Sequence, residues 1–279
     1  MSNELIHHLE GRRFEFGANW SRYLEVLDDT RIQHAEESLK QMLKVATLHG
    51  RTFLDIGSGS GLFSLAARRL GAHVRSFDYD PKSVACAVEL KRRYFPDDAN
   101  WTIEQGSVLD EKYIRSLGKF DVVYSWGVLH HTGAMWQALE NACVPIAPRG
   151  LLFVSIYDDQ GRATLYWKAV KRLYNQLPRG LKFFVLGPAF VRLWGPTTIR
   201  DCLCGRPFWT WRNYFLKRGM SPWRDVVDWV GGYPFEVAKP EEVFEFYRDR
   251  GFRLVTLKTA HGRGCNEFIF KKENAGAMP

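Results

Sequence analysis

Three glycines at alternate positions, Gly57, Gly59 and Gly61, form the sequence feature best suited to ligand binding. They lie in DIGSGSG, between the apolar run RTFLDIG and the helix-like segment SLAARRLG. Residues without a Cβ allow a tight turn and a close approach of backbone to a bound molecule. Asp78 follows Gly57 by 21 residues and ends the next apolar run, where a carboxylate can accept both hydroxyls of a ribose. The combination predicts a site for an adenosyl ligand.

More than one adenosyl ligand fits this pattern. A dinucleotide site usually has the spacing GxGxxG, which brings a helix N-terminus to the pyrophosphate, whereas this loop reads GxGxG and follows Asp55. Asp80 competes with Asp78 for the ribose, and a glycine turn that binds nothing is the structural alternative. A nicotinamide-dependent oxidoreductase is therefore one of the alternatives.

Candidate acid–base residues follow the fourth and fifth apolar runs. His130 and His131 come shortly after FDVVYSWG, and histidine titrates near neutral pH, as suits a general base. Tyr157 ends LLFVSIY and Asp158 and Asp159 follow it, where a carboxylate can orient a second substrate. The alternatives are packing or capping histidines and an aspartate that caps the following helix. No Cys, His and acid cluster has the spacing of a metal site, so the sequence predicts no metal.

The elements that must position these residues alternate between strand and helix. From 51 to 157, five short apolar runs alternate with segments of three- and four-residue apolar spacing, as in a parallel sheet covered by crossover helices. A helix at 240–251 and alternating segments at 252–260 and 266–272 predict a final hairpin. The predicted fold is α/β: a doubly wound, mostly parallel seven-stranded Rossmann-like sheet with a C-terminal antiparallel hairpin and an inserted helical cap.

This interpretation divides the chain into four stretches. Residues 1–50 form an N-terminal helical lid, 51–157 the ligand-binding core, 158–236 the cap for the second substrate, and 237–279 the last helix and strands of the core. Charged first residues and five scattered cysteines predict a cytoplasmic protein with reduced thiols. The longest apolar run, FFVLGPAFV, is interrupted by a Gly-Pro pair and is too short to cross a bilayer.

Four motifs in the core resemble those of a known family. LDIGSGSG, FDYDP, EQGSV and FDVVYSWGVLHH are similar to the successive cofactor motifs of class I S-adenosylmethionine-dependent methyltransferases. The resemblance runs through 51–157, resumes in the final hairpin and implies S-adenosylmethionine as cofactor. The cofactor-binding residues that it implies are Asp55, Gly57, Ser58, Gly59, Gly61, Asp78, Tyr79, Gly106, Ser107, Val108, Trp126 and, from the N-terminal lid, Trp20.

The resemblance also implies a role for each part of this set. Asp55 and the first two glycines hold the methionine end of the cofactor, and Asp78 holds the ribose. Residues 106–108 hold the adenine edge through main-chain groups, although the family often has an acid where this chain has Ser107. Trp126 lines the methionine moiety or covers the adenine face, with plain packing as the alternative. The implied activity is in-line methyl transfer, in which a base matters most for hydroxyl acceptors.

The predicted cap carries a large excess of positive charge. Residues 160–224 contain thirteen Lys or Arg, thirteen aromatic residues and one acid, Asp201, in a chain of net charge +8. Basic and aromatic side chains together can bind phosphates, stack on rings or lie at a membrane surface. The candidate partners are a phosphorylated or nucleotide-linked small molecule, a lipid-linked glycan, a membrane surface and RNA; RNA is disfavoured because no binding module is recognisable. The alternative is a cap whose aromatics form its own small core.

The sequence as a whole predicts an S-adenosylmethionine-dependent methyltransferase with a small-molecule acceptor, anionic or linked to a lipid or glycan. Transfer to oxygen is favoured over nitrogen or carbon. The alternatives are the oxidoreductase, an RNA methyltransferase and a non-catalytic module that binds an adenosyl ligand. Composition leaves the oligomeric state open.

Overall fold

The computed structural model describes residues 17, 20, 23–218, 221–260, 262 and 264–273. The chain divides into two compact units. The sheet unit contains Gly17–Gln160 and the residues from Glu236 onward, and the helical unit contains Gly161–Phe235. Each unit is described by itself.

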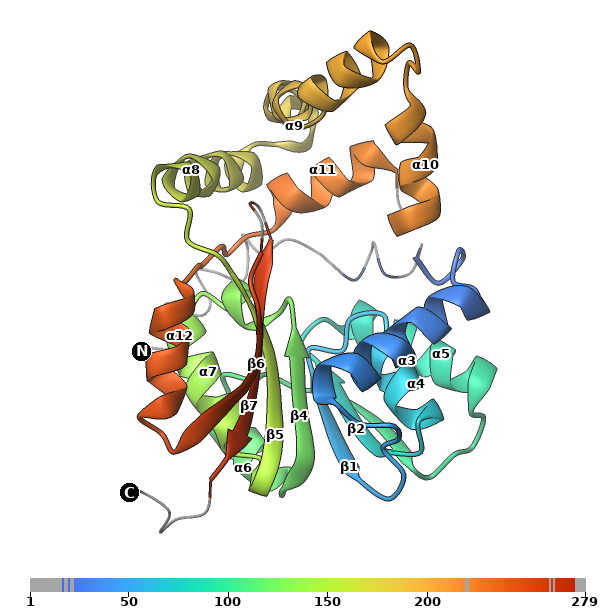
Figure 1. The fold of residues 1–279 in the computed structure, drawn as a ribbon, viewed down its shortest axis with the longest axis vertical. Helices are drawn as coiled ribbons and strands as arrows, with labels where there is room; N and C mark the ends of the chain where they lie inside the picture. Colours follow the sequence, from blue (N-terminus) through green and yellow to red (C-terminus); the bar gives the residue numbers. More distant parts are fainter. Residues whose placement is uncertain are drawn as a thin grey trace. The chain divides into compact units, whose positions relative to one another are not determined.

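The sheet unit is built on strands in the order β3-β2-β1-β4-β5-β7-β6 (Figure 1). These strands are β1 (Thr52–Ile56), β2 (His73–Asp78), β3 (Trp101–Gln105), β4 (Phe120–Trp126), β5 (Ile146–Tyr157), β6 (Phe252–Lys258) and β7 (Cys265–Lys272). The first five pair in parallel, and β7 runs antiparallel to both β5 and β6. Strand order reverses between β1 and β4, and open α/β sheets bind ligands at such a switch point. The predicted Rossmann-like sheet with its terminal hairpin is confirmed.

Helices cover both faces of this sheet (Figure 1). On one face lie α3 (Asp29–Leu43), α4 (Leu62–Arg69) and α5 (Pro81–Tyr94), and on the other lie α6 (Glu111–Ser116), α7 (Met135–Cys143) and α12 (Pro240–Arg248). The short helix α6 and the start of β5 at Ile146, before Pro148, were not predicted from the sequence. Side chains of a strand point alternately to the two faces, so neighbouring residues enter different cores.

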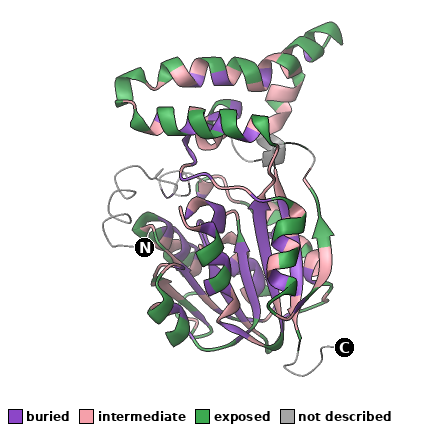
Figure 2. Cartoon of the chain, turned by 90° about the vertical axis from the view of Figure 1, so that its left-hand side faces the viewer, coloured by how far each residue is buried: buried purple, intermediate pink, exposed green. Residues whose placement is uncertain are grey.

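Phe53 and Leu54 of β1 illustrate this alternation, because each belongs to a different hydrophobic cluster. Ile269 and Phe270 of β7 divide in the same way. Figure 2 shows the central strands buried, while the covering helices bury only their inner faces. The carboxyl edge of the strands is left for polar side chains and loops.

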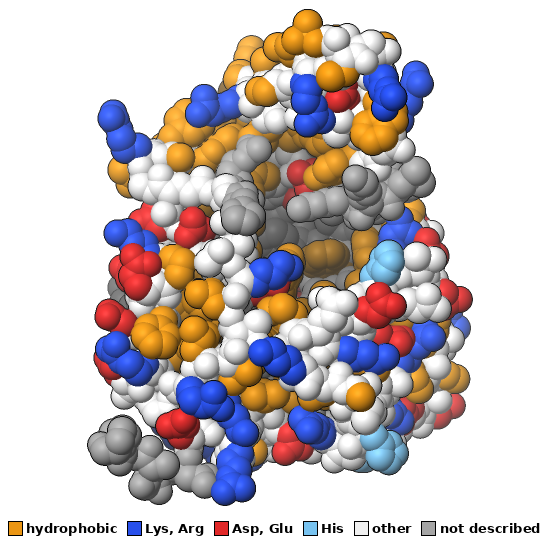
Figure 3. Space-filling view, in the orientation of Figure 1, with side chains coloured by type: hydrophobic (Ala, Val, Ile, Leu, Met, Phe, Trp, Pro, Cys, Tyr) orange, Lys and Arg blue, Asp and Glu red, His pale blue; other side chains and the backbone are white. Residues whose placement is uncertain are grey.

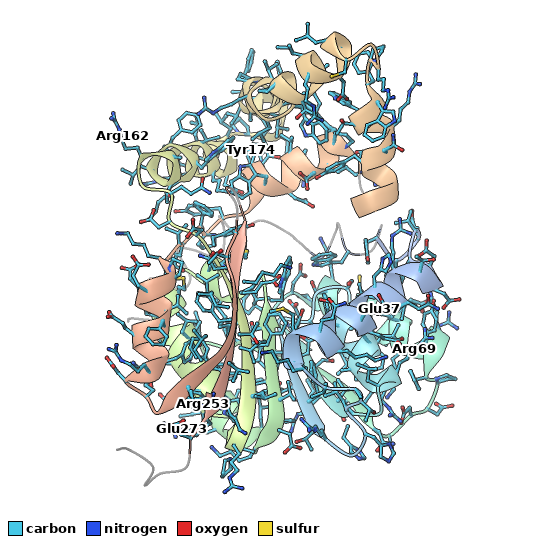
Figure 4. The ribbon with its side chains drawn as sticks, viewed as in Figure 1. Glu37, Arg69, Arg162, Tyr174, Arg253 and Glu273 are labelled. Atoms are coloured by element: carbon cyan, nitrogen blue, oxygen red, sulfur yellow. The ribbon has the colours of Figure 1, made fainter. Side chains whose placement is uncertain are left out.

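The chain leaves and re-enters the sheet unit at a single place. Asp158 and Ala238 form a parallel bridge, and Ala238 N donates to Tyr157 O at 3.0 Å. At the far end of the hairpin, Arg253 Nε lies 3.5 Å from Glu273 Oε1, and Figure 4 shows the two side chains next to each other. Polar contacts therefore link neighbouring segments at both ends of the antiparallel part of the sheet.

The helical unit consists of α8 (Arg162–Gln176), α9 (Phe183–Leu203), α10 (Trp209–Arg218) and α11 (Pro222–Gly231). Helix α9 packs against the other three, and its contacts are largely aromatic. The ring of Trp194 lies 5.4 Å from that of Trp211 and 4.7 Å from that of Tyr214, and Phe190 lies 5.1 Å from Trp211. Several of the aromatic residues therefore pack among themselves.

Helix α9 continues through the Gly-Pro pair that interrupts the longest apolar run, and it also contains Pro196. A proline inside a helix removes one backbone hydrogen bond, and here burial of Leu186, Ala189 and Trp194 against neighbouring helices offsets that loss. No helix in the described part of the chain has the length and apolarity of a membrane span.

Candidate functional site

The glycine loop follows β1 at its carboxyl end, beside the switch point. Gly57, Gly59 and Gly61 have φ values of 75°, 55° and 82°, a region that residues with a Cβ seldom adopt. A Cβ on Gly57 would lie 2.4 Å from Val128 Cγ1, and one on Gly61 would lie 2.9 Å from Ala87 Cα. The glycines therefore permit both the turn and the close packing of the loop.

Asp78 ties this loop to the end of β2. Its Oδ2 accepts a hydrogen bond from Gly59 N and its Oδ1 accepts one from Asp80 N, both at 2.9 Å. Asp80 is the N-cap of α5, since its Oδ1 accepts from Lys82 N at 2.9 Å, and its Oδ2 accepts from Gly17 N at 2.9 Å. Of the two competing acids, Asp78 lies at the glycine loop and Asp80 caps a helix.

Two carboxyl groups lie at this edge, Asp55 buried and Asp78 half-buried. Asp55 is 2 % exposed, and its Oδ2 accepts from the Ser64 hydroxyl at 2.6 Å. Burial raises the pKa of Asp55 to about 7, against the opposing effect of the Ser64 hydrogen bond and with a further rise from the charge of Asp78. Burial also raises the pKa of Asp78 to about 6, against hydrogen bonds from Asp80 and Gly59. A positively charged ligand would favour the ionised form of both groups.

Two further predicted residues lie in or over the loop. The hydroxyl Oγ of Ser58 is buried and has no hydrogen-bond partner among the described residues, an arrangement that is rare unless a ligand completes it. A Cβ on Gly59 would lie 3.1 Å from Cε2 and Nε1 of Trp20, so this indole lies against the loop. Trp20 packs edge-on against Tyr23. Residues 1–16 of the predicted lid lie outside the described residues.

The segment 106–108 follows β3 at the same edge. Gly106 N donates to Asp78 O at 3.0 Å, which joins this segment to β2. The Ser107 hydroxyl accepts from Leu109 N at 3.2 Å and so stabilises the turn.

Val108 and Tyr79 complete this part of the site. The carbonyl of Val108 accepts from the side-chain amide of buried Asn141 at 2.8 Å. Tyr79 is exposed, and its carbonyl accepts from Gln105 Nε2 at 3.2 Å. The backbone of both segments is therefore held by side chains from elsewhere in the sheet unit.

Trp126 ends β4 and is 44 % exposed. Its indole Nε1 donates to Glu267 Oε1 at 2.9 Å, and Lys258 Nζ lies 3.4 Å from Glu267 Oε2. Trp126 and Glu267 both pair with Ser155 of β5, so they share a face of the sheet. The carboxylate therefore fixes the orientation of the tryptophan.

The predicted bases form a ring cluster with Tyr157. The ring of His130 lies 4.1 Å from that of Tyr157 and 4.6 Å from that of His131. His130 is fully buried, and its carbonyl accepts from Glu236 N at 3.0 Å, whereas His131 is half-buried at the end of a short 3-10 helix (Leu129–His131). The structure brings the three predicted residues together, with His131 the more accessible histidine.

Asp158 is hydrogen-bonded to residues of the final hairpin. Its Oδ1 accepts from Asn266 Nδ2 at 2.9 Å, and its backbone N donates to Gly264 O at 3.1 Å. The N-cap of α8 is Gly161, without a side-chain cap hydrogen bond, so the alternative that an aspartate caps this helix is wrong. Among the described residues, no group of three His, Cys, Asp or Glu side chains is placed to hold a metal ion.

This geometry can be compared with that of known proteins. A family model described as a methyltransferase domain matches residues 48–209, more than half of the chain. The chain belongs to the class I S-adenosylmethionine-dependent methyltransferases. The nicotinamide-dependent oxidoreductase that the glycine loop alone allowed is therefore wrong, and S-adenosylmethionine is the cofactor of this methyltransferase.

Curated relatives of this methyltransferase are named ubiquinone biosynthesis O-methyltransferase. One from Methylobacterium sp. (strain 4-46) is 28% identical over 134 residues, which are 48% of this chain and 52% of that protein. One from Coxiella burnetii is 25% identical over 158 residues, which are 56% of this chain and 62% of that protein. The methyltransferase thus spans little more than half the length of the curated relatives it matches.

Solved structures share its fold. The magnesium protoporphyrin IX methyltransferase of Synechocystis PCC 6803, solved with S-adenosylhomocysteine bound, has a TM-score of 0.52 and 14% identity, covering 87% of this chain and 83% of that one. An O-methyltransferase family protein from Burkholderia thailandensis has a TM-score of 0.54 and 12% identity, covering 88% and 58%. At these identities the likeness shows the fold alone.

The residues at the glycine loop fit the cofactor of this family. The buried Ser58 hydroxyl lacks a partner in the described structure, and the carboxyl groups of Asp55 and Asp78, whose pKa values are raised by desolvation, favour a cation. The sequence did not indicate Ser64, Asn141 or Glu267, which hold Asp55, Val108 and Trp126 in place. Only the order of the strands brings Glu267 to Trp126, since 141 residues separate them.

Proposed function

We propose that this methyltransferase transfers the methyl group of S-adenosylmethionine to an oxygen atom of a small-molecule acceptor that is anionic or linked to a lipid or glycan. The observation that carries the cofactor half of the proposal is the pair of carboxyl groups at a glycine loop, Asp55 buried and Asp78 half-buried. The names of the curated relatives support the acceptor half. S-adenosylmethionine supplies a methyl group on a positively charged sulfur.

In this proposal each part of the edge has one task. Asp55, Gly57, Ser58, Gly59 and Gly61 bind the methionine end. Asp78 accepts from the ribose hydroxyls, for which its lone pairs beyond the two backbone bonds are available. Residues 106–108, with Tyr79 and Trp126, enclose the adenine, and Trp20 closes the loop and excludes water.

The proposed base is His131, positioned by the rings of His130 and Tyr157. A base must reach the acceptor hydroxyl within hydrogen-bond distance, and the accessible surface of His131 allows that contact whereas His130 is buried. His130 and Tyr157 then act as positioning residues. Asp158 holds the hairpin through its hydrogen bond with Asn266 and supports the backbone next to Tyr157.

Calorimetry with S-adenosylhomocysteine and NADH tests the cofactor half. We expect binding of S-adenosylhomocysteine alone, and a loss of at least about tenfold in affinity for Asp78→Ala. Asp80→Asn, which keeps a side-chain acceptor for the cap of α5, is the matched control and leaves the affinity near that of the wild type.

Transfer of labelled methyl groups to paired panels of small phenols and the corresponding anilines tests the acceptor half. We expect product from hydroxyl acceptors, and a fall in kcat of about 100-fold for His131→Ala with little change in S-adenosylhomocysteine affinity. Labelling confined to the anilines would overturn transfer to oxygen. An equal loss of cofactor affinity in His131→Ala would make the histidine part of the cofactor pocket.

A further inference from the structure

Helix α9 of the helical unit is apolar on both of its faces. Its inner face carries Leu186, Ala189 and Trp194, all buried among the neighbouring helices. Its outer face carries Phe184, Val191, Ile199 and Leu203, which are 63%, 68%, 62% and 83% exposed. A helix that is apolar all round is normally buried all round, and the described part of the chain leaves this outer face exposed.

The outer residues form a stripe on one side of the helix. Phe184, Val191, Ile199 and Leu203 fall within about 120° of the helix circumference, together with the exposed Arg192. Helix α8 also carries exposed apolar residues, Leu165 and Leu173. Exposed apolar patches of this kind mark interaction surfaces.

The exposed charged residues in the described part of the helical unit have one sign. The exposed basic residues among the described residues of the helical unit are Arg162, Lys168, Arg172, Arg179, Arg192, Arg200, Arg206, Arg212 and Arg224. The acids of the unit, Asp201, Asp225 and Asp228, are all buried or half-buried. Figure 3 shows basic side chains of this unit interspersed with hydrophobic ones, and in Figure 4 Arg162 points away from the helices.

We propose that the helical unit binds the surface of an anionic lipid bilayer, with the outer face of α9 inserted among the acyl chains and the surrounding Lys and Arg side chains against the headgroups. Two observations select this partner. Aliphatic side chains such as Val191, Ile199 and Leu203 gain free energy in hydrocarbon and offer nothing to a nucleic acid. Basic side chains gain free energy near anionic headgroups.

The two interactions also complement each other physically. An apolar face inserted at the interface, together with electrostatic attraction, gives reversible binding to a membrane surface without a spanning helix. A purely apolar partner would not explain why the described helical unit exposes basic residues and no acids. A purely electrostatic partner would not explain its exposed aliphatic side chains. This inference goes beyond the proposed methyl transfer and does not depend on it.

Vesicle co-sedimentation of the full chain tests the proposal. We expect binding to phosphatidylcholine vesicles that contain phosphatidylserine, a strong reduction at high salt, and little binding to phosphatidylcholine alone. Val191→Ser combined with Ile199→Ser removes the stripe, and Lys168→Glu combined with Arg172→Glu reverses two charges. Each pair should weaken binding by about tenfold or more.

Matched controls lie on the sheet unit. Val88→Ser with Leu257→Ser changes exposed apolar residues, and Arg51→Glu with Lys112→Glu changes exposed basic ones. These controls should bind vesicles like the wild type, and every variant should keep the helical circular dichroism and the thermal unfolding profile of the wild type, which show that its helices are folded. Failure of methyl transfer would leave these vesicle results unchanged, so the two proposals fail separately.

Three outcomes would overturn the proposal. The first is no binding to anionic vesicles at low salt. The second is equal loss of binding in the stripe and control variants. The third is evidence that another partner occupies this surface. Such evidence would be a dimer in light scattering that Val191→Ser with Ile199→Ser abolishes, or binding to RNA in place of vesicles.

Discussion

Asp55 and Asp78 carry the electrostatic consequence of the site at the scale of single residues. Their pKa values of about 7 and about 6 leave both partly protonated near neutral pH. A cationic cofactor favours the ionised forms, so its binding releases protons and its affinity falls as the pH drops from about 7 through about 6. Calorimetry with S-adenosylmethionine across this range, in buffers of different protonation enthalpy, measures the release.

S-adenosylhomocysteine is the control ligand because it lacks the sulfonium charge, and its affinity should depend less on pH. Asp55→Asn should flatten the profile of S-adenosylmethionine. Equal pH profiles for the two ligands would contradict the electrostatic account.

Glu267 allows a second test at the same scale, because it fixes Trp126 by one hydrogen bond. Glu267→Ala removes the acceptor, whereas Glu267→Gln keeps an oxygen for the indole N–H. A net hydrogen bond contributes about 1 kcal/mol, so we expect about fivefold weaker S-adenosylhomocysteine binding for the alanine variant and near wild-type binding for the glutamine variant. Equal losses in both would assign the effect to the charge of Glu267.

Among the elements, the loop between β1 and α4 is the most constrained. In Gly57→Ala the new Cβ clashes with Val128, and the backbone at this position has a positive φ that alanine seldom adopts. Gly118 has a φ of 87° with nothing within 4 Å of its Cβ position, so Gly118→Ala isolates the backbone strain. We expect unfolding free energies lowered by about 1 kcal/mol for Gly118→Ala and by about 2 kcal/mol or more for Gly57→Ala in denaturant titrations. Val128→Ala should partly restore the stability of Gly57→Ala and should not restore that of Gly118→Ala.

The pairing of α8 with α11 rests partly on a buried lysine. Lys171 Nζ donates to the carbonyl of Trp229 and lies 4.1 Å and 4.6 Å from the ring centroids of Trp229 and Phe235. Burial lowers the pKa of Lys171 to about 7 from its usual 10.5. The unfolded chain therefore binds this proton more tightly, and the free energy of unfolding should rise with pH between about 7 and 10.5.

Lys171→Met keeps the shape of the chain and removes the charge. It should stabilise the protein near neutral pH by on the order of 1 kcal/mol and lose this advantage toward about pH 10. Thermal unfolding at the two pH values measures the difference. Lys168→Met, at an exposed position of the same helix, should change neither value, and a destabilised Lys171→Met at neutral pH would mean that the cation contributes to packing.

Secondary-structure elements could be predicted from the sequence where the spacing of apolar residues follows a single period. The strands of the core appear in the sequence as short apolar runs, and the positions of the glycine loop and Asp78 followed from the ends of β1 and β2. The sequence predicted a helical cap but not the bounds of its helices, and those of α9 follow no local rule because two prolines oppose it and the tertiary contacts of Trp194 and its neighbours stabilise it. Glu267, Asn141 and the cap role of Asp80 needed the strand order and the backbone, since no spacing rule connects a residue of β7 to one of β4.

At the scale of the whole molecule, the two units have separate cores. None of the described residues between 161 and 235 belongs to either hydrophobic cluster of the sheet unit. Because Tyr157 and Ala238 are hydrogen-bonded neighbours, a short Gly-Ser linker can replace 161–235. We expect the shortened chain to bind S-adenosylhomocysteine within about threefold of the wild type and to lose vesicle binding. Aggregation of the shortened chain, or loss of cofactor binding, would show that the sheet unit depends on the helical one.

Strand β7 lies between β5 and β6, although it is the last of these strands in the sequence. Its residues Phe268 and Phe270 enter one core and Ile269 enters the other. During synthesis from the N-terminus, the edge of β5 and both cores stay open until this segment has left the ribosome. The cofactor loop is thus translated well before the sheet that supports it can close, and we expect chaperones that bind exposed strand edges to associate with the nascent chain in that interval.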